Sequence, residues 1–312
     1  MFKVVFFQVR ILAFISVLAL AVIFSGCHSS SGKNARFVFP DEDSVPLAQA
    51  EQLSEEALDD IARNISSPVE IADILQRMHV PFSSGYLASS IDASRQSTSF
   101  DKALKLGILG ADLGYLNMYE KTGTSIDVLS SIKKLADGIN VGQFFDFETL
   151  KRLSLNRTNL DSLLYMSLDS YNQIDKFLRE KGRGQLSALM ITGVWIEGQY
   201  LATQVLKQFP DTLLRNRVGE QKVILNDLIM LVAPYCTLGN EYSALCKDLQ
   251  ELREKYRDVR ITYTIGEPQM VEKDGALVVV QTDQSKVEMT DEQLEAITVT
   301  TEKIRNRHIT NN

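Results

Sequence analysis

The hydrophobic residues of this chain recur with the period of an α-helix from about residue 50 to residue 258, and this pattern constrains the fold more than any other feature. A helix with one apolar face must bury that face against other helices. The sequence therefore predicts a multi-helix bundle. Polar stretches, prolines and glycines divide it into helices expected at about residues 53–65, 67–78, 100–120, 126–139, 146–155, 160–180, 186–208, 213–232 and 241–257, with 83–99 a long loop or broken helix.

The pattern changes after residue 258. Residues 261–265 and 276–280 have β-like sequences, Asp274-Gly275 between them is a turn signal, and 286–289 fits a third short strand. Thr290 is expected to cap a last helix with acidic residues in its first turn and basic residues in its last. The predicted fold class is therefore mainly α, a multi-helix bundle with a small C-terminal αβ appendage.

The first residues have the pattern of an export signal. Lys3 and Arg10 are followed by a continuous apolar run that ends at Phe24-Ser25-Gly26-Cys27, and polar residues come next. This end resembles the lipobox of bacterial lipoproteins. The resemblance implies cleavage before Cys27 and acylation of that cysteine, for example with palmitate. The alternative is an uncleaved membrane anchor, which would leave the chain facing the same compartment.

The lipobox resemblance also sets the expected location and domain boundaries. Cys27 is followed by His28 rather than the aspartate of the inner-membrane retention signal, and no acidic run follows, which favours the periplasmic side of the outer membrane. We expect four parts: a signal peptide at 1–26, the lipidated cysteine and a tether at 27–50, an α-helical domain at 51–258, and short strands with a C-terminal helix at 259–312. Ser44 in the tether lies in a motif resembling the O-glycosylation acceptor of Bacteroidetes envelope proteins.

Two further cysteines, Cys236 and Cys246, remain in the mature chain. An even pair in an oxidising envelope is compatible with one disulfide that closes a short loop. The alternative is two buried thiols on helical segments. The spacing of the pair matches no metal or redox motif.

Glycines occur at helical spacing in two of the predicted helices. Gly107, Gly110 and Gly114 share one face of the first, and Gly193 and Gly198 lie on the second. Each glycine costs a helix about 1 kcal/mol relative to alanine, so a close contact must offset it. The expected contact is the backbone of another helix, and the alternative is a ligand held against bare backbone.

Several acidic residues interrupt otherwise apolar helices, and they could form a buried polar network or a site. They are Asp112, Asp161, Asp169, Glu197 and Asp227, with Arg152, Arg157 and Lys222 as candidate partners. Aromatic residues on the same helices could form the wall of a binding site or could simply be core. The candidate ligand-binding set is Asp112, Trp195, Glu197 and Tyr200.

Other functional classes lack their signals in the sequence. The formal net charge is −7, and −9 once Lys3 and Arg10 leave with the signal, with no basic stripe for nucleic acid. None of the three histidines follows an acidic residue by three positions, as a di-metal bundle requires. Neither a Gly-x-Ser-x-Gly elbow nor a phosphate-binding loop is present. We therefore expect no catalytic residue, no metal and no cofactor.

Much of the mature chain is similar to an uncharacterised family of Bacteroidetes lipoproteins, and no activity comes with that resemblance. The runs that carry it are GILGADLGYLNMYEKTG, NLDSLLYMSLDSYN, GVWIEG and VGEQKVILNDL. The leading hypothesis is a lipid-anchored, non-enzymatic binding or assembly module with a protein partner in the envelope. The alternative is a periplasmic sensor or carrier that holds a small ligand between helices near Asp112 and Glu197.

Overall fold

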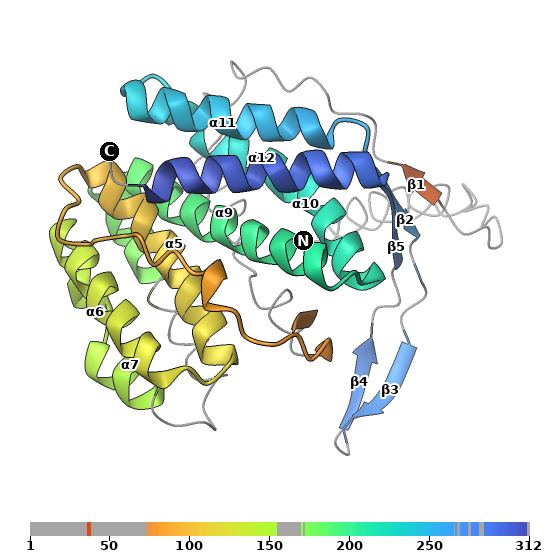
Figure 1. Cartoon of the computed structure of the whole chain (residues 1–312), viewed down its shortest axis with the longest axis horizontal. Helices are drawn as coiled ribbons and strands as arrows, with labels where there is room; N and C mark the ends of the chain where they lie inside the picture. Colours follow the sequence, from red (N-terminus) through yellow and green to blue (C-terminus); the bar gives the residue numbers. More distant parts are fainter. Residues whose placement is uncertain are drawn as a thin grey trace, which may run out of the picture. The chain divides into compact units, whose positions relative to one another are not determined.

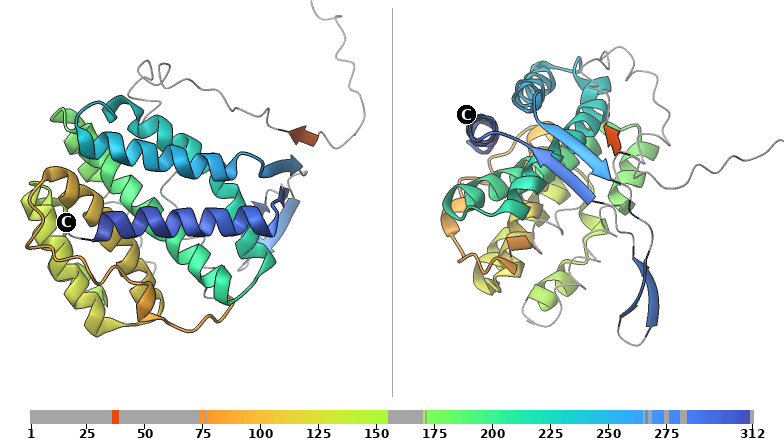
Figure 2. Two further views of the ribbon diagram at one scale, coloured as in Figure 1. Left: turned by 45° about the horizontal axis from the view of Figure 1, so that its top comes forward. Right: turned by 90° about the vertical axis from the view of Figure 1, so that its right-hand side faces the viewer.

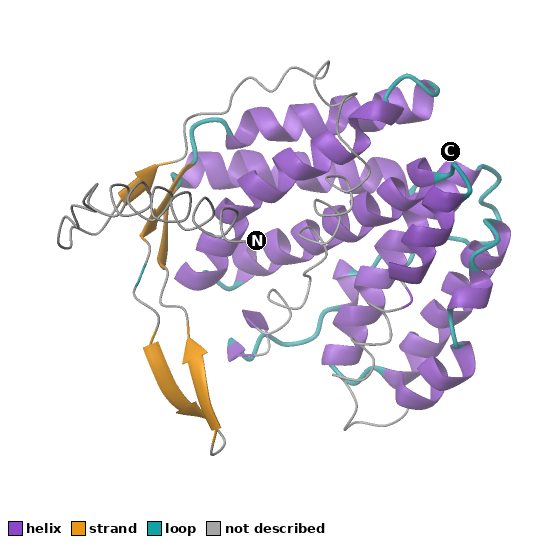
Figure 3. Cartoon of the chain, turned by 180° about the vertical axis from the view of Figure 1, so that it is seen from behind, coloured by secondary structure: helices purple, strands orange, loops and turns teal. Residues whose placement is uncertain are grey.

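The computed structural model is mainly α-helical, which confirms the predicted fold class (Figure 1; Figure 3). It describes residues 36–38, 74–75, 77–154, 170, 172–264, 266, 269–273, 276–280 and 284–310. The chain divides into two units. The larger comprises Phe37–Tyr263 and Gln284–Asn312, and the smaller comprises Met1–Arg36 and Thr264–Asp283.

The helices of the larger unit match those expected from the periodicity to within a few residues. They are α5 (Ser99–Met118), α6 (Thr122–Gly138), α7 (Phe147–Ser154), α9 (Gly184–Gln208), α10 (Thr212–Val232), α11 (Asn240–Tyr256) and α12 (Asp291–Ile309), with helical turns at residues 172–180 and 3-10 turns η1 (Ser84–Tyr86), η2 (Gly142–Phe144) and η3 (Ala233–Tyr235). The expected helix at 53–65, most of 67–78 and the start of 160–180 lie outside the described residues.

Side-chain caps begin four of the described helices, including α7, where Asp146 Oδ1 accepts from the backbone N–H of Thr149 at 3.0 Å. Thr98 and Asp211 accept hydrogen bonds from the backbone N–H groups of Asp101 and Leu214. Thr290 forms the cap predicted for α12 as a reciprocal box, since its hydroxyl accepts from Gln293 N at 3.2 Å while its own N–H donates to Gln293 Oε1 at 2.7 Å. The start of the C-terminal helix is therefore fixed by local sequence.

Helices α5 and α9 cross in direct backbone contact at the centre of the bundle. A Cβ atom on Gly107 would collide with the carbonyl group of Met190, and one on Gly193 would collide with that of Leu104. The predicted packing role is thus confirmed for these two glycines. It is wrong for Gly110, Gly114 and Gly198, whose added Cβ would meet nothing within 4 Å. Gly110 is exposed and Gly114 and Gly198 are half-buried, so these glycines lie off the line along which the two backbones touch.

The remaining helices surround this crossing. Helix α9 is buried along most of its length, α6 packs on α5, and α10 packs on α9. Helix α12 returns from the C-terminal strands and packs on both α9 and α11 (Figure 2). Two segments far apart in sequence, α9 and the C-terminal helix, therefore share an interface.

The strands form two small sheets, and two of them lie where the sequence suggested none. β1 (Arg36–Val38), β2 (Arg260–Thr264) and β5 (Gln284–Glu288) form one sheet in the order β1-β2-β5. β1 falls inside the stretch expected to be tether. Its Phe37-Val38 pair has high β propensity, and an edge strand can be this short.

The second sheet is the antiparallel hairpin of β3 (Gln269–Lys273) and β4 (Ala276–Val280). The sequence placed a turn signal at Asp274-Gly275, between 261–265 and 276–280, and these two residues lie outside the described residues. The strand that pairs with 276–280 is β3, with Lys273 opposite Ala276. β3 has mixed polar and apolar residues, and so its sequence gave little signal.

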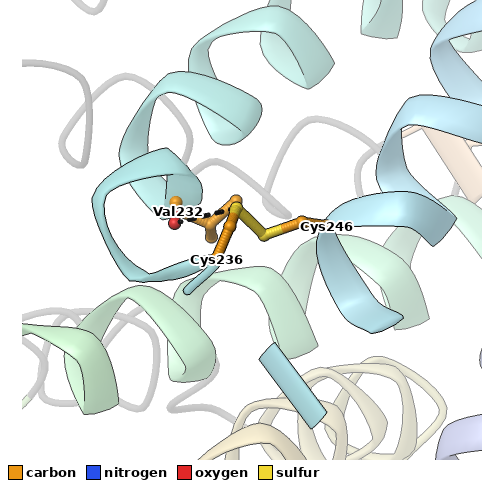
Figure 4. Close-up of a disulfide and its surroundings, with 3 residues drawn as sticks. All are labelled: Val232, Cys236 and Cys246. Atoms are coloured by element: carbon orange, nitrogen blue, oxygen red, sulfur yellow. Dashed lines mark hydrogen bonds between the residues drawn. A yellow bond between two sulfur atoms is a disulfide. The ribbon is translucent and has the colours of Figure 1, made fainter. Parts of the chain in front are cut away.

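Cys236 and Cys246 are joined in a disulfide, as predicted, with their Cα atoms 5.9 Å apart (Figure 4). Cys236 directly follows η3 and lies beside the carbonyl of Val232, at the end of α10, while Cys246 lies in α11. The bridge thus ties the end of α10 to α11. Among the described helices, none is both long and apolar enough to cross a membrane.

The crossing of α5 and α9 predicts a contrast between glycines. Gly193→Ala should lower the free energy of unfolding by about 1–3 kcal/mol, because the new methyl group forces the two backbones apart. Gly110→Ala is the matched control, since it adds the same methyl group into open space and should raise stability by up to about 1 kcal/mol through helix propensity. Urea denaturation measures both. Equal effects of the two substitutions would contradict the close crossing.

Candidate functional site

Two acidic residues singled out from the sequence meet in the interior beside a cation from the C-terminal helix. Asp112 comes from α5, Glu197 from α9 and Arg305 from α12. Their relative exposures are 1%, 0% and 3%, so all three ionisable side chains are removed from solvent. We call these three residues the acid–arginine cluster.

Glu197 and Arg305 form a bidentate ion pair. Nε of Arg305 donates to Oε2 of Glu197 at 2.9 Å, and Nη2 donates to Oε1 at 2.7 Å. The same Nη2 also donates to the backbone carbonyl of Tyr86 at 3.0 Å, and the guanidinium carbon lies 4.3 Å from the ring centroid of Tyr200. Planar, bidentate geometry of this kind is specific to arginine.

Asp112 is held by the loop that precedes α5. Its Oδ2 accepts a hydrogen bond from the backbone N–H of Ala88 at 2.8 Å. In the same region, Tyr115 Oη accepts from the backbone N–H of Ser83 at 3.0 Å. The sequence predicted a long loop or broken helix at 83–99. Two hydrogen bonds, from the backbone N–H groups of Ser83 and Ala88, therefore connect this loop to α5. Through the Tyr86 carbonyl it is also fastened to α12.

Burial dominates the electrostatics of the cluster. It raises the pKa of Asp112 well above the usual carboxyl value, and the charge of Glu197 raises it further, while the Ala88 N–H and Arg305 oppose the change. Burial also raises the pKa of Glu197 against the opposing hydrogen bonds from Arg305 and Asp112. For Arg305, burial is the largest single influence and lowers the pKa, but the hydrogen bond and charge of Glu197 together with Tyr200 and Asp112 outweigh it, so the net direction is upward.

The aromatic candidates separate into two places. Tyr200 belongs to the cluster through its contact with Arg305. Trp195 does not, because its Nε1 donates to Gln221 Oε1 on α10 at 2.9 Å. Tyr115 and Tyr119 pack edge to face with ring centroids 4.9 Å apart, and burial raises the pKa of Tyr119 to about 12. Three of the four predicted ligand-binding residues, Asp112, Glu197 and Tyr200, are thus brought together.

The cation of the cluster is not one that the sequence suggested. Lys222, a predicted partner, instead donates to the backbone carbonyls of Arg257 and Val259, near the end of α11. Asp227 is half-buried on α10. The other candidates lie outside the described side chains: Arg152, Arg157, Asp161 and Asp169.

Arg305 was not predicted as the partner of the buried acids, because it lies among the basic residues expected at the end of a helix. A signal was nonetheless present in the sequence. Arg305 follows Ile297 by eight residues and precedes Ile309 by four, spacings that place it on the apolar face of α12 rather than its solvent face. Ile297 and Ile309 are both buried. A basic residue on a buried stripe needs an acidic partner.

This arrangement can hold segments together, but it offers no accessible acid or base. Both oxygens of Glu197 are engaged by one guanidinium, and neither carboxyl reaches solvent. Within the described parts of the chain, no group of three or more histidine, cysteine, aspartate or glutamate side chains is placed to hold a metal ion. The contacts of the cluster therefore hold α5, α9, α12 and the loop before α5 together.

Comparison with known proteins found no match to a family model, to a curated protein or to a solved structure.

The ion pair predicts a large loss of stability on Arg305→Met. Methionine fills the space but leaves Glu197 buried without a cation, which costs about 3–5 kcal/mol of unfolding free energy. Lys303→Met on the same helix is the control, because Lys303 pairs with Glu251 at an exposed position and should cost at most about 1 kcal/mol. Chemical denaturation followed by circular dichroism gives both values. A loss at residue 305 no larger than that at 303 would contradict the role assigned to Arg305.

Proposed function

We propose that this protein is a lipid-anchored cell-envelope protein that acts as a non-enzymatic binding or assembly module. The observation that carries the proposal is the N-terminal sequence, in which Lys3, Arg10 and an apolar run lead to Phe24-Ser25-Gly26-Cys27. Cys27 lies outside the described residues, so the proposal for the anchor rests on sequence. Several acyl chains on one cysteine would hold the protein firmly, since each buried methylene contributes about 0.8 kcal/mol.

The disulfide between Cys236 and Cys246 supports an exported protein. Disulfides persist in oxidising compartments and are rare where thiols are kept reduced. The resemblance to Bacteroidetes lipoproteins points the same way. On this proposal the protein lies in the outer membrane with its folded part on the periplasmic side, and Ser44 is a candidate glycosylation site outside the described residues.

The acid–arginine cluster supports a non-enzymatic role. A general acid or base must reach the atom whose proton it moves. Asp112 and Glu197 lie in apolar surroundings, but both side chains are sealed from solvent. Their partners are a backbone N–H and an arginine of the same chain.

The same geometry argues against a small ligand at this place. A ligand between α5 and α9 would have to displace Arg305 from Glu197 and leave a buried anion unpaired. Trp195, the remaining member of the predicted set, is engaged by Gln221 instead. We therefore propose contacts made by the outer surface of the folded domain with another envelope protein, rather than a ligand within it.

The anchor predicts the behaviour of Cys27→Ser. The variant should lose incorporation of radiolabelled fatty acid and move from the membrane to the soluble envelope fraction, because serine cannot accept the lipid through a thioether. Cys246→Ser is a control cysteine substitution that should keep both the label and the membrane fraction. Unchanged membrane retention of Cys27→Ser would contradict lipid anchoring and favour an uncleaved anchor.

The assembly role predicts a protein neighbour. Crosslinking of lysines in intact cells, followed by mass spectrometry, should give reproducible links from the folded domain to one or a few envelope proteins. The Cys27→Ser strain is the matched control, since the same folded domain is present without its anchor and should lose links to partners held at the membrane. Links confined to this chain in both strains would contradict a binding or assembly module.

A further inference from the structure

The charges within the acid–arginine cluster do not balance if both carboxyls are ionised. Two carboxylates would share one guanidinium, which leaves a net negative charge at a place where Asp112 is 1% and Glu197 is 0% exposed. A buried, uncompensated carboxylate is so costly that such a group takes up a proton instead. One of the two carboxyls therefore has to be neutral.

The hydrogen bonds show which oxygen has room for that proton. Both oxygens of Glu197 accept from Arg305, and Oδ2 of Asp112 accepts from the N–H of Ala88. Oδ1 of Asp112 is buried and receives no donor from the described part of the chain. The carboxyl groups of Asp112 and Glu197 act on each other, and an ionised carboxylate is only an acceptor. A hydrogen bond between two carboxyls requires a proton on one of them.

We propose that Asp112 carries a proton on Oδ1 in the folded protein and donates it to Glu197, so that the cluster is a buried proton-binding site which couples α12 to the bundle. Glu197 then remains the anion that Arg305 needs, and the cluster as a whole is neutral. Folding takes up one proton at neutral pH, because the unfolded aspartate is ionised there.

The groups around the pair are consistent with this balance. Among the described residues, two phenols interact with the cluster: Tyr115 of α5 with Asp112, and Tyr200 of α9 with Glu197 and Arg305. Tyr86 of η1 and Glu302 of α12 act on Tyr200. Burial raises the pKa of the three phenols, so they stay neutral near neutral pH. No second cation from the described residues approaches Asp112 to replace the proton.

The site has a consequence for the C-terminal helix. When the proton leaves, two adjacent anions compete for Arg305, and the docking of α12 on α9 loses strength. Because the folded state binds one more proton than the unfolded state, stability falls as pH rises from the ordinary carboxyl value toward the raised pKa of Asp112. The predicted response is therefore a loosening toward alkaline pH.

Asp112→Asn tests the proposal in the full protein purified in detergent. The amide copies a neutral acid, since it can donate to Glu197 and accept from Ala88, and it has no proton to lose. The ratio of the folding constant of Asp112→Asn to that of the unchanged protein should rise with pH above about 4, by up to tenfold per pH unit. Asp127→Asn, at an exposed aspartate on α6, is the control and should give a ratio independent of pH.

A constant or falling ratio for Asp112→Asn would overturn the proposal, because it would mean that Asp112 folds without taking up a proton. A second measurement needs no variant and stays informative if Asp112→Asn fails to fold. At pH 7 the unchanged protein should show the infrared carbonyl band of a protonated carboxylic acid, and the band should shift when aspartate carboxyls carry carbon-13. A missing band, or a band that shifts only with labelled glutamate, would overturn the placement of the proton on Asp112.

Discussion

The close crossing of α5 and α9 at Gly107 and Gly193 determines how the interior of the domain is arranged. At this point the backbones touch, with a glycine of each helix against a carbonyl of the other. Five residues after Gly107 comes Asp112, and four residues after Gly193 comes Glu197. The distance between the two helices therefore also sets the distance between the two carboxyls. A larger residue at either glycine would separate the acids as well as the backbones.

The acids in turn fix the elements that pack on this helix pair. Arg305 reaches Glu197 from α12, and the loop before α5 reaches Asp112 through Ala88 and Arg305 through the carbonyl of Tyr86. One small cluster thus joins parts of the chain more than 200 residues apart, since Tyr86 and Arg305 differ by 219 positions. The irregular segment at 83–98 needs these anchors, because it has little regular structure of its own to satisfy its backbone groups.

Local signals were sufficient to predict most of the helices, the Thr290 cap, the disulfide and two of the three members of the acid–arginine cluster. Each depends on residues near one another in sequence, such as an apolar period or a capping residue. The errors concern long-range partners. Lys222 was a reasonable cation for the acids, but only the fold shows that its ammonium lies beside the end of α11. β3, the partner of β4, was not predicted because its mixed polar and apolar residues give no clear pattern, and Gly110 resembles Gly107 in sequence but not in position.

A buried ion pair is weak evidence for stability, because apolar side chains of the same volume often stabilise a core equally well. What Arg305 adds is a single permitted register for α12. A slip of one helical turn, about 5.4 Å, would place Thr301 or Ile309 opposite Glu197 and leave the carboxylate buried without a cation. Apolar residues tolerate such a slip far better, and the threonine-rich face of this helix offers few large side chains to resist it. The polar contact therefore specifies where the C-terminal helix docks.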